Sequence, residues 1–407
     1  MAYQEVTTTG YGTRVGNSFK AIGSGILLFL AGTAVLWWNE GRAVKTEKML
    51  DEAGSAYVEM ENPNKKDASL EGELICGTAL ATTEDSLSDQ QFGIGAKAIS
   101  LRRSVEYYQW VEHSEEKKED KLGGKEVTTT TYTYSKEWVS RPVESAGFKD
   151  PAYQNKNRVL TTVEDQEQYA ENVSWGAYKL TESLIHSISS REPMELGYDS
   201  AKVASLNKDT AVHVTVNGNQ LYYGSSASGA AEIGDVRVTF EKVVPAKVTV
   251  MAVVDGDSFK PFKAKNGKRF QTLVMGKKSG DEIIDAQKDA NNMWAWALRI
   301  LGVLMVIGGL KGIFGFIETI LKVVPFVAGI FGWGVGLVCS VIGVAWSLIV
   351  IAIAWLFYRP LLGITLLVLA GFLVWVFAFK GKDKLKELAA KAKEKSAKPV
   401  AAPAPAE

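Results

Sequence analysis

Residues 21–44 read AIGSGILLFLAGTAVLWWNEGRAV, and this stretch decides the architecture of the chain. Its first eighteen residues, 21–38, carry no charge. As a helix they would span about 27 Å, close to the ~30 Å thickness of a hydrocarbon core. We therefore predict a transmembrane helix at residues 21–38. A cleaved signal peptide is the alternative, but the run is long for one and ends in two tryptophans rather than at a small-residue cleavage site.

The other long apolar runs lie near the C-terminal end of the chain. Residues 294–314 form the second predicted span. The charged residues Arg299 and Lys311 are compatible with it, because they lie near its ends, where long cationic side chains can reach the headgroups. Arg359 and Pro360 interrupt the apolar sequence that follows, since a charge is costly at mid-membrane and proline ends a helix. The remaining predicted segments are residues 323–334, an interfacial or re-entrant segment with a further full span as the alternative, and two spans at 335–357 and 361–379.

Between the first two spans lies a polar insert, residues 45–290, that reads mainly as β-structure. Two alternating apolar runs occupy residues 236–262, and threonine alternates with tyrosine at 127–139, with 104–113 as the expected partner strand. Asn217-Gly218-Asn219 predicts a hairpin turn. Helical patterns are limited to a segment near Leu180 and to residues 43–53. The predicted fold is a four-span helical membrane protein with a large β-rich (α+β) domain inserted after the first span.

Charge predicts the orientation of these segments. Lysine plus arginine and aspartate plus glutamate number 46 each, which gives no reason to expect a nucleic-acid partner. The tail at 380–407 is rich in lysine, and positive charge next to a span is retained in the cytoplasm. We read this tail as a solvated tether, with attraction to anionic lipid as the alternative. Four crossings then place residues 1–20 inside and residues 45–290 outside or in a lumen, although Arg359 would lie on the outer face, against the rule.

The insert shows no recognisable catalytic, cofactor or metal signature. The two cysteines, Cys76 and Cys339, lie in different predicted regions, so neither a disulfide within the insert nor a cysteine metal cluster is expected. The histidines His113, His186 and His213 are far apart in the sequence. Hydrolase, kinase and nucleotide-binding motifs are absent from the sequence. We expect no cofactor and favour a protein that is not an enzyme.

Polar and aromatic residues at the ends of the predicted spans form the candidate site. Ionisable groups at such positions can mark lipid-handling or transport sites, whereas simple interfacial anchoring is the alternative. Glu40 has cationic neighbours expected from other spans, so the segment after the first span could lock that helix to the C-terminal bundle, and Gly41 is placed to end or bend the helix. The candidate residues are Trp38, Asn39, Glu40, Gly41, Arg42, Arg299, Tyr358 and Arg359.

Glycine spacing adds a prediction about packing. Gly308 with Gly312, and Gly332 with Gly336, match the pattern of small residues that lets two helices approach closely. This favours a packed bundle and leaves the oligomeric state open.

Several segments together resemble one known family. WNEGRAV at 38–44, directly after the first predicted span, is similar to the corresponding segment of the transmembrane protein 43 (LUMA) family. The resemblance covers residues 12–379 and is carried further by FGIGAKAISLRRSVEYYQWVE at 92–112, TYTYSKEW at 131–138, IGDVRVTFEKVVPAKVTVMA at 233–252 and WLFYRPL at 355–361. It implies a four-span protein with a large lumenal or extracytoplasmic domain.

The resemblance also implies a role and a location. Animal members of that family organise protein complexes at the endoplasmic reticulum and inner nuclear membrane, in association with lamins and emerin. The Lys/Ala/Pro tail after Phe379 departs from that pattern and is typical of a bacterial protein, for which the cell membrane is the expected location; in a eukaryote it would be the endoplasmic reticulum or inner nuclear membrane. No catalytic residue is transferred by the resemblance.

Two functional hypotheses follow. The first is a multi-pass membrane scaffold that organises membrane protein complexes through its large domain, with membrane lipids, other membrane proteins and further copies of the chain as expected partners. The second is a lipid-handling enzyme or transport protein that uses Glu40, Arg42, Arg299 and Arg359. If the second holds, these four side chains should converge on one concave site.

Overall fold

The computed structural model describes residues 3–206, 212–226, 230–321, 323, 325–361, 363–365 and 368. The chain divides into two compact units. The first, here the β unit, comprises residues 1–20, 45–293 and 315–333, and the second, here the helical unit, comprises residues 21–44, 294–314 and 334–407. The protein is therefore a helical membrane protein with a large β-rich part.

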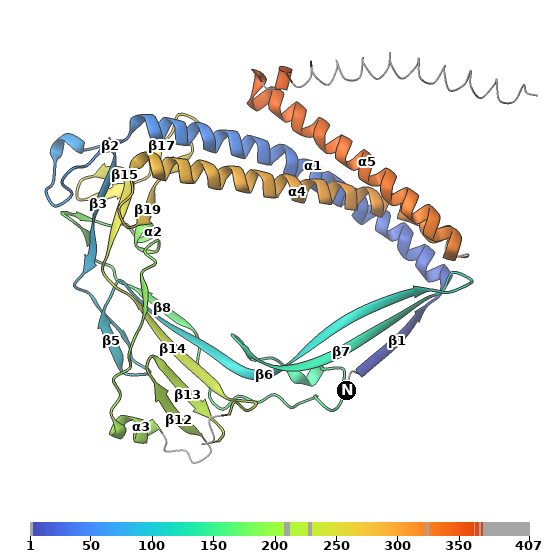
Figure 1. Ribbon diagram of the computed structural model, residues 1–407, viewed down its shortest axis with the longest axis horizontal. Coiled ribbons are helices and arrows are strands. Elements are labelled where there is room, and N and C mark those ends of the chain that lie inside the picture. The colour runs from blue at the N-terminus through green and yellow to red at the C-terminus, as the bar shows by residue number, and fades with distance from the viewer. Residues whose placement is uncertain are drawn as a thin grey trace, which may run out of the picture. The chain divides into compact units, whose positions relative to one another are not determined.

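Three long helices carry the apolar sequence (Figure 1). They are α1 (Tyr11–Ala56), α4 (Gly280–Leu321) and α5 (Pro325–Tyr358). Each contains a stretch long and apolar enough to cross a membrane. The first two predicted spans fall in the middle of α1 and α4, and the third falls in α5. The predicted span at 361–379 lies almost wholly outside the described residues.

Two helix boundaries differ from the sequence-based expectation. Gly41 neither ends α1 nor separates it from the helical segment expected at 43–53, because α1 continues without interruption to Ala56. A helical glycine costs only about 1 kcal/mol relative to alanine, so favourable packing can outweigh it. The segment predicted as interfacial or re-entrant, 323–334, is helical from Pro325 and continuous with α5. Proline at the first helical position needs no hydrogen-bonded N–H, which explains this start.

Two sheets make up most of the β unit. The eight-stranded sheet contains β1 (Tyr3–Thr9), β6 (Ser100–Asp120), β7 (Glu126–Val139), β8 (Gln166–Tyr169), β11 (Arg191–Pro193), β12 (His213–Asn217), β13 (Gln220–Gly224) and β14 (Val236–Val243). The seven-stranded sheet contains β2 (Val58–Glu59), β3 (Leu74–Thr83), β9 (Val173–Trp175), β10 (Tyr178–Lys179), β15 (Ala246–Asp255), β16 (Ser258–Lys260) and β19 (Thr272–Met275).

Short elements complete the β unit. Two small hairpins pair β4 (Ser86–Asp89) with β5 (Ile94–Lys97) and β17 (Phe262–Lys263) with β18 (Arg269–Phe270). The short helices are α2 (Glu182–Ile185), α3 (Ser200–Leu206), η1 (Ala68–Leu70) and η2 (Ser145–Gly147). The helix expected near Leu180 is thus a single turn, α2.

The seven-stranded sheet is buried on both faces. On one face, alternate residues of β15 such as Val250 and Val254 pack with Trp175 and α2. On the other, Met251 and Val253 pack with the last turns of α1 and the first turns of α4. A strand covered on both sides reads as a continuous apolar run, which explains the sequence VTVMAVV.

The eight-stranded sheet has its core around β14 and β6. Val236, Val238 and Phe240 of β14 are fully buried. The hairpin predicted at Asn217-Gly218-Asn219 is confirmed, because β12 pairs with β13 across Gly218, whose φ is +58°. The predicted pairing of residues 104–113 with 127–139 is also confirmed, in the antiparallel pair of β6 with β7. Beyond about Ser114, β6 is exposed and its hairpin with β7 runs on as a long ribbon with β1 beside β7 (Figure 1).

The β1 strand lies at one edge of the eight-stranded sheet, next to β7. All seven residues of β1 pair with β7, in the register Tyr3↔Tyr132 to Thr9↔Glu126.

Candidate interhelical site around Glu40

Glu40 lies in the helical unit, and its side chain is 1% exposed. Arg299 of α4 donates from Nε to Oε1 at 2.6 Å and from Nη2 to Oε2 at 2.8 Å. Trp355 of α5 donates from Nε1 to Oε2 at 2.6 Å. The carboxylate of α1 thus accepts three hydrogen bonds from two other helices, and two of them form a bidentate arginine pair, which is among the stronger hydrogen-bonded geometries.

The guanidinium of Arg299 is held by aromatic rings as well as by charge. Its carbon lies 4.9 Å from the centroid of the Trp296 ring and 5.7 Å from that of Trp355. Arginine is suited to this position, because a planar cation can stack on rings while its N–H groups bind a carboxylate. With 16% of its side chain exposed, Arg299 is largely removed from solvent within the chain.

Asn39 provides a second connection between α1 and α4. Its Nδ2 donates to the carbonyl of Ala295 at 2.9 Å, and its Oδ1 accepts from Arg42 Nη2 at 3.2 Å. Asn39 has no exposed surface. Arg42 therefore fixes the amide of Asn39 from three residues along the same helix, a spacing that places the two side chains on one face.

Gly41 and Trp37 provide the contact with the end of α5. A Cβ built on Gly41 would lie 2.7 Å from Cζ of Tyr358, so a side chain there would displace this ring. The Trp37 ring meets the rings of Phe357 and Tyr358 edge-on at 5.3 and 6.1 Å. Trp38 is 59% exposed and points away from these contacts. An exposed tryptophan at the end of an apolar run suits the membrane interface.

The structure thus brings together most of the candidate residues named from the sequence. Asn39, Glu40, Gly41 and Arg42 contact α4, α5 or each other, and Arg299 and Tyr358 are their partners. Arg359 donates its backbone N–H to the carbonyl of Trp355 at 2.7 Å, and Trp38 faces outward. Of the charged candidates, Glu40 pairs with Arg299, and Arg42 donates to Asn39. We use the term Glu40 cluster for Asn39, Glu40, Arg299 and Trp355.

Sequence reasoning missed Trp355 and Trp296. A signal for Trp355 was available in WLFYRPL, since residues three and four apart on a helix share a face and Trp355 precedes Tyr358 and Arg359 by those spacings. The indole N–H needs an acceptor when it is buried, and Glu40 supplies one.

Farther along the helical unit, glycines allow α1 and α4 to approach each other closely. A Cβ on Gly309 would lie 2.5 Å from the backbone N of Phe29 and 2.7 Å from the carbonyl of Gly25, and one on Gly312 would lie 3.0 Å from Gly25 Cα. Gly308, expected as the contact, faces only the side chain of Leu28, at 3.3 Å. Gly312 is therefore a close contact, as predicted, whereas Gly309 makes the contact that was expected of Gly308.

Several residues of this site lie in a region that matches a known protein family. A family model described as Transmembrane protein 43 matches residues 107–360, the region that contains Arg299, Trp355 and Tyr358. The chain is 31% identical to Transmembrane protein 43 of Rattus norvegicus over 362 residues, which is 86% of this chain and 88% of the relative. This chain belongs to the transmembrane protein 43 family.

Other relatives give the same result. The human protein is 30% identical with the same coverage, and the Drosophila melanogaster homologue is 26% identical over 85% of this chain and 91% of its own length. No solved structure matches the chain. The family resemblance drawn from WNEGRAV and its companion segments is confirmed.

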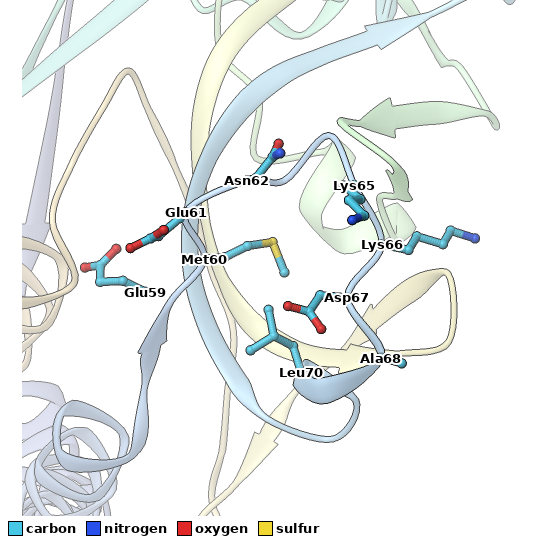
Figure 2. Close-up of a pocket in the computed structure, with 9 residues that line it drawn as sticks. All are labelled: Glu59, Met60, Glu61, Asn62, Lys65, Lys66, Asp67, Ala68 and Leu70. Atoms are coloured by element: carbon cyan, nitrogen blue, oxygen red, sulfur yellow. The ribbon is translucent and has the colours of Figure 1, made fainter.

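The β unit of this transmembrane protein 43 family member also contains pockets. Figure 2 shows one of about 450 Å³ between Glu59 and Leu70, lined by side chains of both charges. In this pocket, Oδ1 of Asp67 accepts hydrogen bonds from the hydroxyl and the backbone N–H of Ser69. These bonds lower the pKa of the Asp67 carboxyl. The lining therefore carries three carboxylates, on Glu59, Glu61 and Asp67, against two lysines, Lys65 and Lys66.

Neither metal nor thiol chemistry is indicated in the part of the chain that the structure describes. Over those residues, no group of three histidine, cysteine, aspartate or glutamate side chains could hold a metal ion. Cys76 is fully buried in β3, and burial, with Glu59 and Asp281 nearby, raises the pKa of its thiol to about 12. A thiol with this pKa is a poor nucleophile near neutral pH.

Proposed function

We propose that this transmembrane protein 43 family member is an integral membrane scaffold that organises membrane protein complexes through its β unit. The observation that carries the proposal is that the Glu40 carboxylate is already fully engaged by hydrogen bonds from other helices. Its two carboxylate oxygens accept three hydrogen bonds from Arg299 and Trp355. A buried charge used in this way fixes three helices relative to each other and is not free to bind a substrate.

The same observation weighs against a lipid-handling enzyme or transport protein. Such a protein would need boundary charges that reach a ligand, whereas Arg299 pairs with Glu40 and Arg42 with Asn39. A ligand would have to break a bidentate ion pair in a poorly solvated place. Removing one partner of such a pair costs about 3–5 kcal/mol.

The basic tail at 380–407 supports a further part of the proposal. Its lysines follow directly on the apolar sequence, and we place this tail in the cytoplasm by the positive-inside rule. The membrane is the cell membrane in a bacterial host, and the endoplasmic reticulum or inner nuclear membrane in a eukaryotic one. Partners are other membrane proteins, membrane lipids and further copies of this chain.

The scaffold proposal can be tested on the full chain. The protein is cross-linked in its native membrane, extracted in mild detergent and sized on a native gel, beside an unrelated complex of the same membrane that must stay intact. We expect the chain in a larger species, with cross-links from the β unit to a membrane protein. A monomer without cross-links, while the reference complex survives, would refute the proposal.

A second measurement separates the two hypotheses. Arg42→Ala removes the charge that fixes Asn39, and Glu40→Gln removes the buried carboxylate. Membranes from cells with either variant, expressed at parental level, are compared with the parent by lipid mass spectrometry. The scaffold proposal expects the same lipid composition in all three. Loss or accumulation of one lipid class in both variants would favour lipid handling.

A further inference from the structure

The hairpin formed by β17 and β18 is a strongly basic segment of the β unit. Residues 260–270 read KPFKAKNGKRF and contain five cations and no acidic residue. Lys263, Lys265 and Arg269 are exposed. Within the part of the chain that the structure describes, no ion pair joins any of these three side chains to a carboxylate. Their charges can therefore meet an external anion.

The hairpin folds against the last turns of α1. Ala264 and Phe270 are buried in one cluster with Ala53 of that helix. Successive residues of an extended chain point to opposite faces, so Lys263 and Lys265, on either side of Ala264, are exposed. The alternation of apolar and basic residues in FKAK thus separates a buried face of the hairpin from a charged face.

Hydrogen bonds fix the tip of the hairpin at one level of α1. Nδ2 of Asn266 donates to the carbonyl of Lys45 at 2.7 Å, and Nζ of Lys268 donates to Oγ1 of Thr46 at 2.6 Å. Gly267 permits the tight turn between these two contacts, because its φ is +82°. The charges of the hairpin are therefore held at a defined position along the helix.

Acidic side chains in the last turns of α1 have partners of their own. Glu52 accepts the backbone N–H of Lys265 at 3.1 Å, and Asp51 pairs with Nζ of Lys288 in α4 at 2.7 Å. We use the term basic hairpin surface for the exposed cations Lys45, Lys263, Lys265 and Arg269. Even with Glu47 and Glu52 counted against it, this surface keeps a positive charge.

The level of Lys45 on α1 places the tip of the hairpin close to the headgroups. The helix is uninterrupted from its apolar stretch to Ala56, and Lys45 follows Trp38 by seven residues. Seven residues of helix rise about 10 Å, and the headgroup layer extends about 5–7 Å beyond the hydrocarbon core. The tip then lies about 3–5 Å above the headgroups, less than the screening length of about 8 Å at physiological ionic strength. The Cα–Cβ bond of Lys45 also tilts toward the start of α1, and hence toward the membrane.

We propose that the basic hairpin surface binds anionic phospholipid headgroups in the leaflet at which α1 leaves the membrane. The phosphate oxygens of such lipids are the charge complement of exposed lysine and arginine side chains held at this height. This surface is separate from the basic tail at 380–407, because the fold holds it against α1. The contact is the same whichever side of the membrane carries the β unit. It needs no partner protein, so it is independent of the scaffold proposal.

Acetylation of individual lysines tests this proposal on the full chain. The protein is placed in lipid nanodiscs of phosphatidylcholine, alone or mixed with phosphatidylglycerol, treated with a neutral acetylating reagent and mapped by mass spectrometry. Anionic lipid favours the protonated amine, and only the neutral amine reacts. A surface potential of about −50 mV slows the reaction roughly sevenfold at the surface and about threefold half a screening length above it. Lys263 and Lys265 should therefore react about threefold more slowly with phosphatidylglycerol present, whereas the exposed Lys65 and Lys66, beyond the far end of α1, should not. Unchanged rates at Lys263 and Lys265 would overturn the proposal.

Two further conditions separate membrane binding from other causes of slow acetylation. At about 1 M salt, where the screening length falls to about 3 Å, the slowing at Lys263 and Lys265 should disappear. Slowing that persists there would point to burial instead of charge and would contradict the proposal. Inorganic phosphate added to discs of phosphatidylcholine alone should leave the rates unchanged. Protection equal to that by phosphatidylglycerol would show a site for free anions and would overturn binding to the membrane.

Lipid retention then tests binding by the cations themselves. The triple variant Lys263→Gln, Lys265→Gln, Arg269→Gln and the parent are extracted from mixed discs in mild detergent, and the phosphatidylglycerol retained is measured by mass spectrometry. Each basic residue near an anionic surface is worth about fivefold in affinity, so the variant should retain less than half as much as the parent. The matched control changes three exposed lysines elsewhere in the β unit, Lys65→Gln, Lys66→Gln and Lys156→Gln, and should retain the parental amount. Equal retention by the parent and the first variant would overturn the proposal. The oligomeric state plays no part in these readouts.

Discussion

Replacing Glu40 with glutamine should loosen the helical unit strongly. The change removes the charge that pairs with Arg299 and leaves at most one good acceptor for the three donors now bound. Breaking a buried ion pair from one side costs about 3–5 kcal/mol. Because 16% of the Arg299 side chain is exposed, we expect the lower end, about 3 kcal/mol. That is roughly a hundredfold change in an opening equilibrium.

Cys339 provides the assay, because it is buried among the helices of the helical unit with Leu36 and Val306. In a Cys76→Ala background and mild detergent, an uncharged maleimide should label Cys339 about a hundredfold faster in Glu40→Gln than in the parent, as this opening energy implies. Glu73→Gln, at an exposed glutamate of the β unit, is the matched control and should leave the rate unchanged. Parental labelling in Glu40→Gln would refute the role given to the Glu40 cluster.

Three further predictions concern other contacts. Gly309→Ala should weaken the helical unit by about 1–3 kcal/mol, because its Cβ would meet backbone atoms that cannot move aside, whereas Gly308→Ala, next to the Leu28 side chain, should cost much less; equal labelling rates of Cys339 in the two variants would contradict this. Ser279→Ala should lower the free energy of unfolding of the β unit by about 1 kcal/mol, because Ser279 and Glu282 form a capping box at the start of α4. The N–H of Glu282 donates to Ser279 Oγ at 3.2 Å, and the N–H of Ser279 donates to Glu282 Oε2 at 2.9 Å. Denaturant titration followed by circular dichroism measures the loss, with Ser69→Ala, in η1, for comparison. Cys76 should resist iodoacetamide at pH 8 in the folded protein and react on unfolding, because its pKa of about 12 keeps it protonated, and only a rise in pH toward 12 would expose thiolate; fast labelling at pH 8 would contradict its burial.

The parts of the fold that the sequence predicted correctly have short-range signals. The turn at Gly218, the β6–β7 hairpin and the apolar segments of α1, α4 and α5 each follow from local periodicity or length. The β1 strand has no such signal. Its partner, β7, lies more than a hundred residues away in the sequence, and no local pattern reveals the pairing.

The candidate site was predicted in part for a related reason. Charge alone suggested that Glu40 would meet a cation from another span, and Arg299 is that cation. The rotation of α4 and α5 about their axes decides whether Arg299 or Arg359 reaches the Glu40 carboxylate. It also decides which indole donates to that carboxylate. That rotation is set by close packing at Gly309 and Gly41, whose partners become visible only in three dimensions.

A double-mutant cycle between Glu40→Gln and Arg299→Gln tests the central claim most directly. If Glu40 joins the helices through Arg299, either change alone leaves one buried group without its partner, and the two losses overlap. The labelling rate of Cys339 should then give a coupling energy of about 2 kcal/mol, with the double variant less destabilised than the sum of the single ones. Strictly additive effects would show that the two side chains do not act together, and the account of the Glu40 cluster would be wrong.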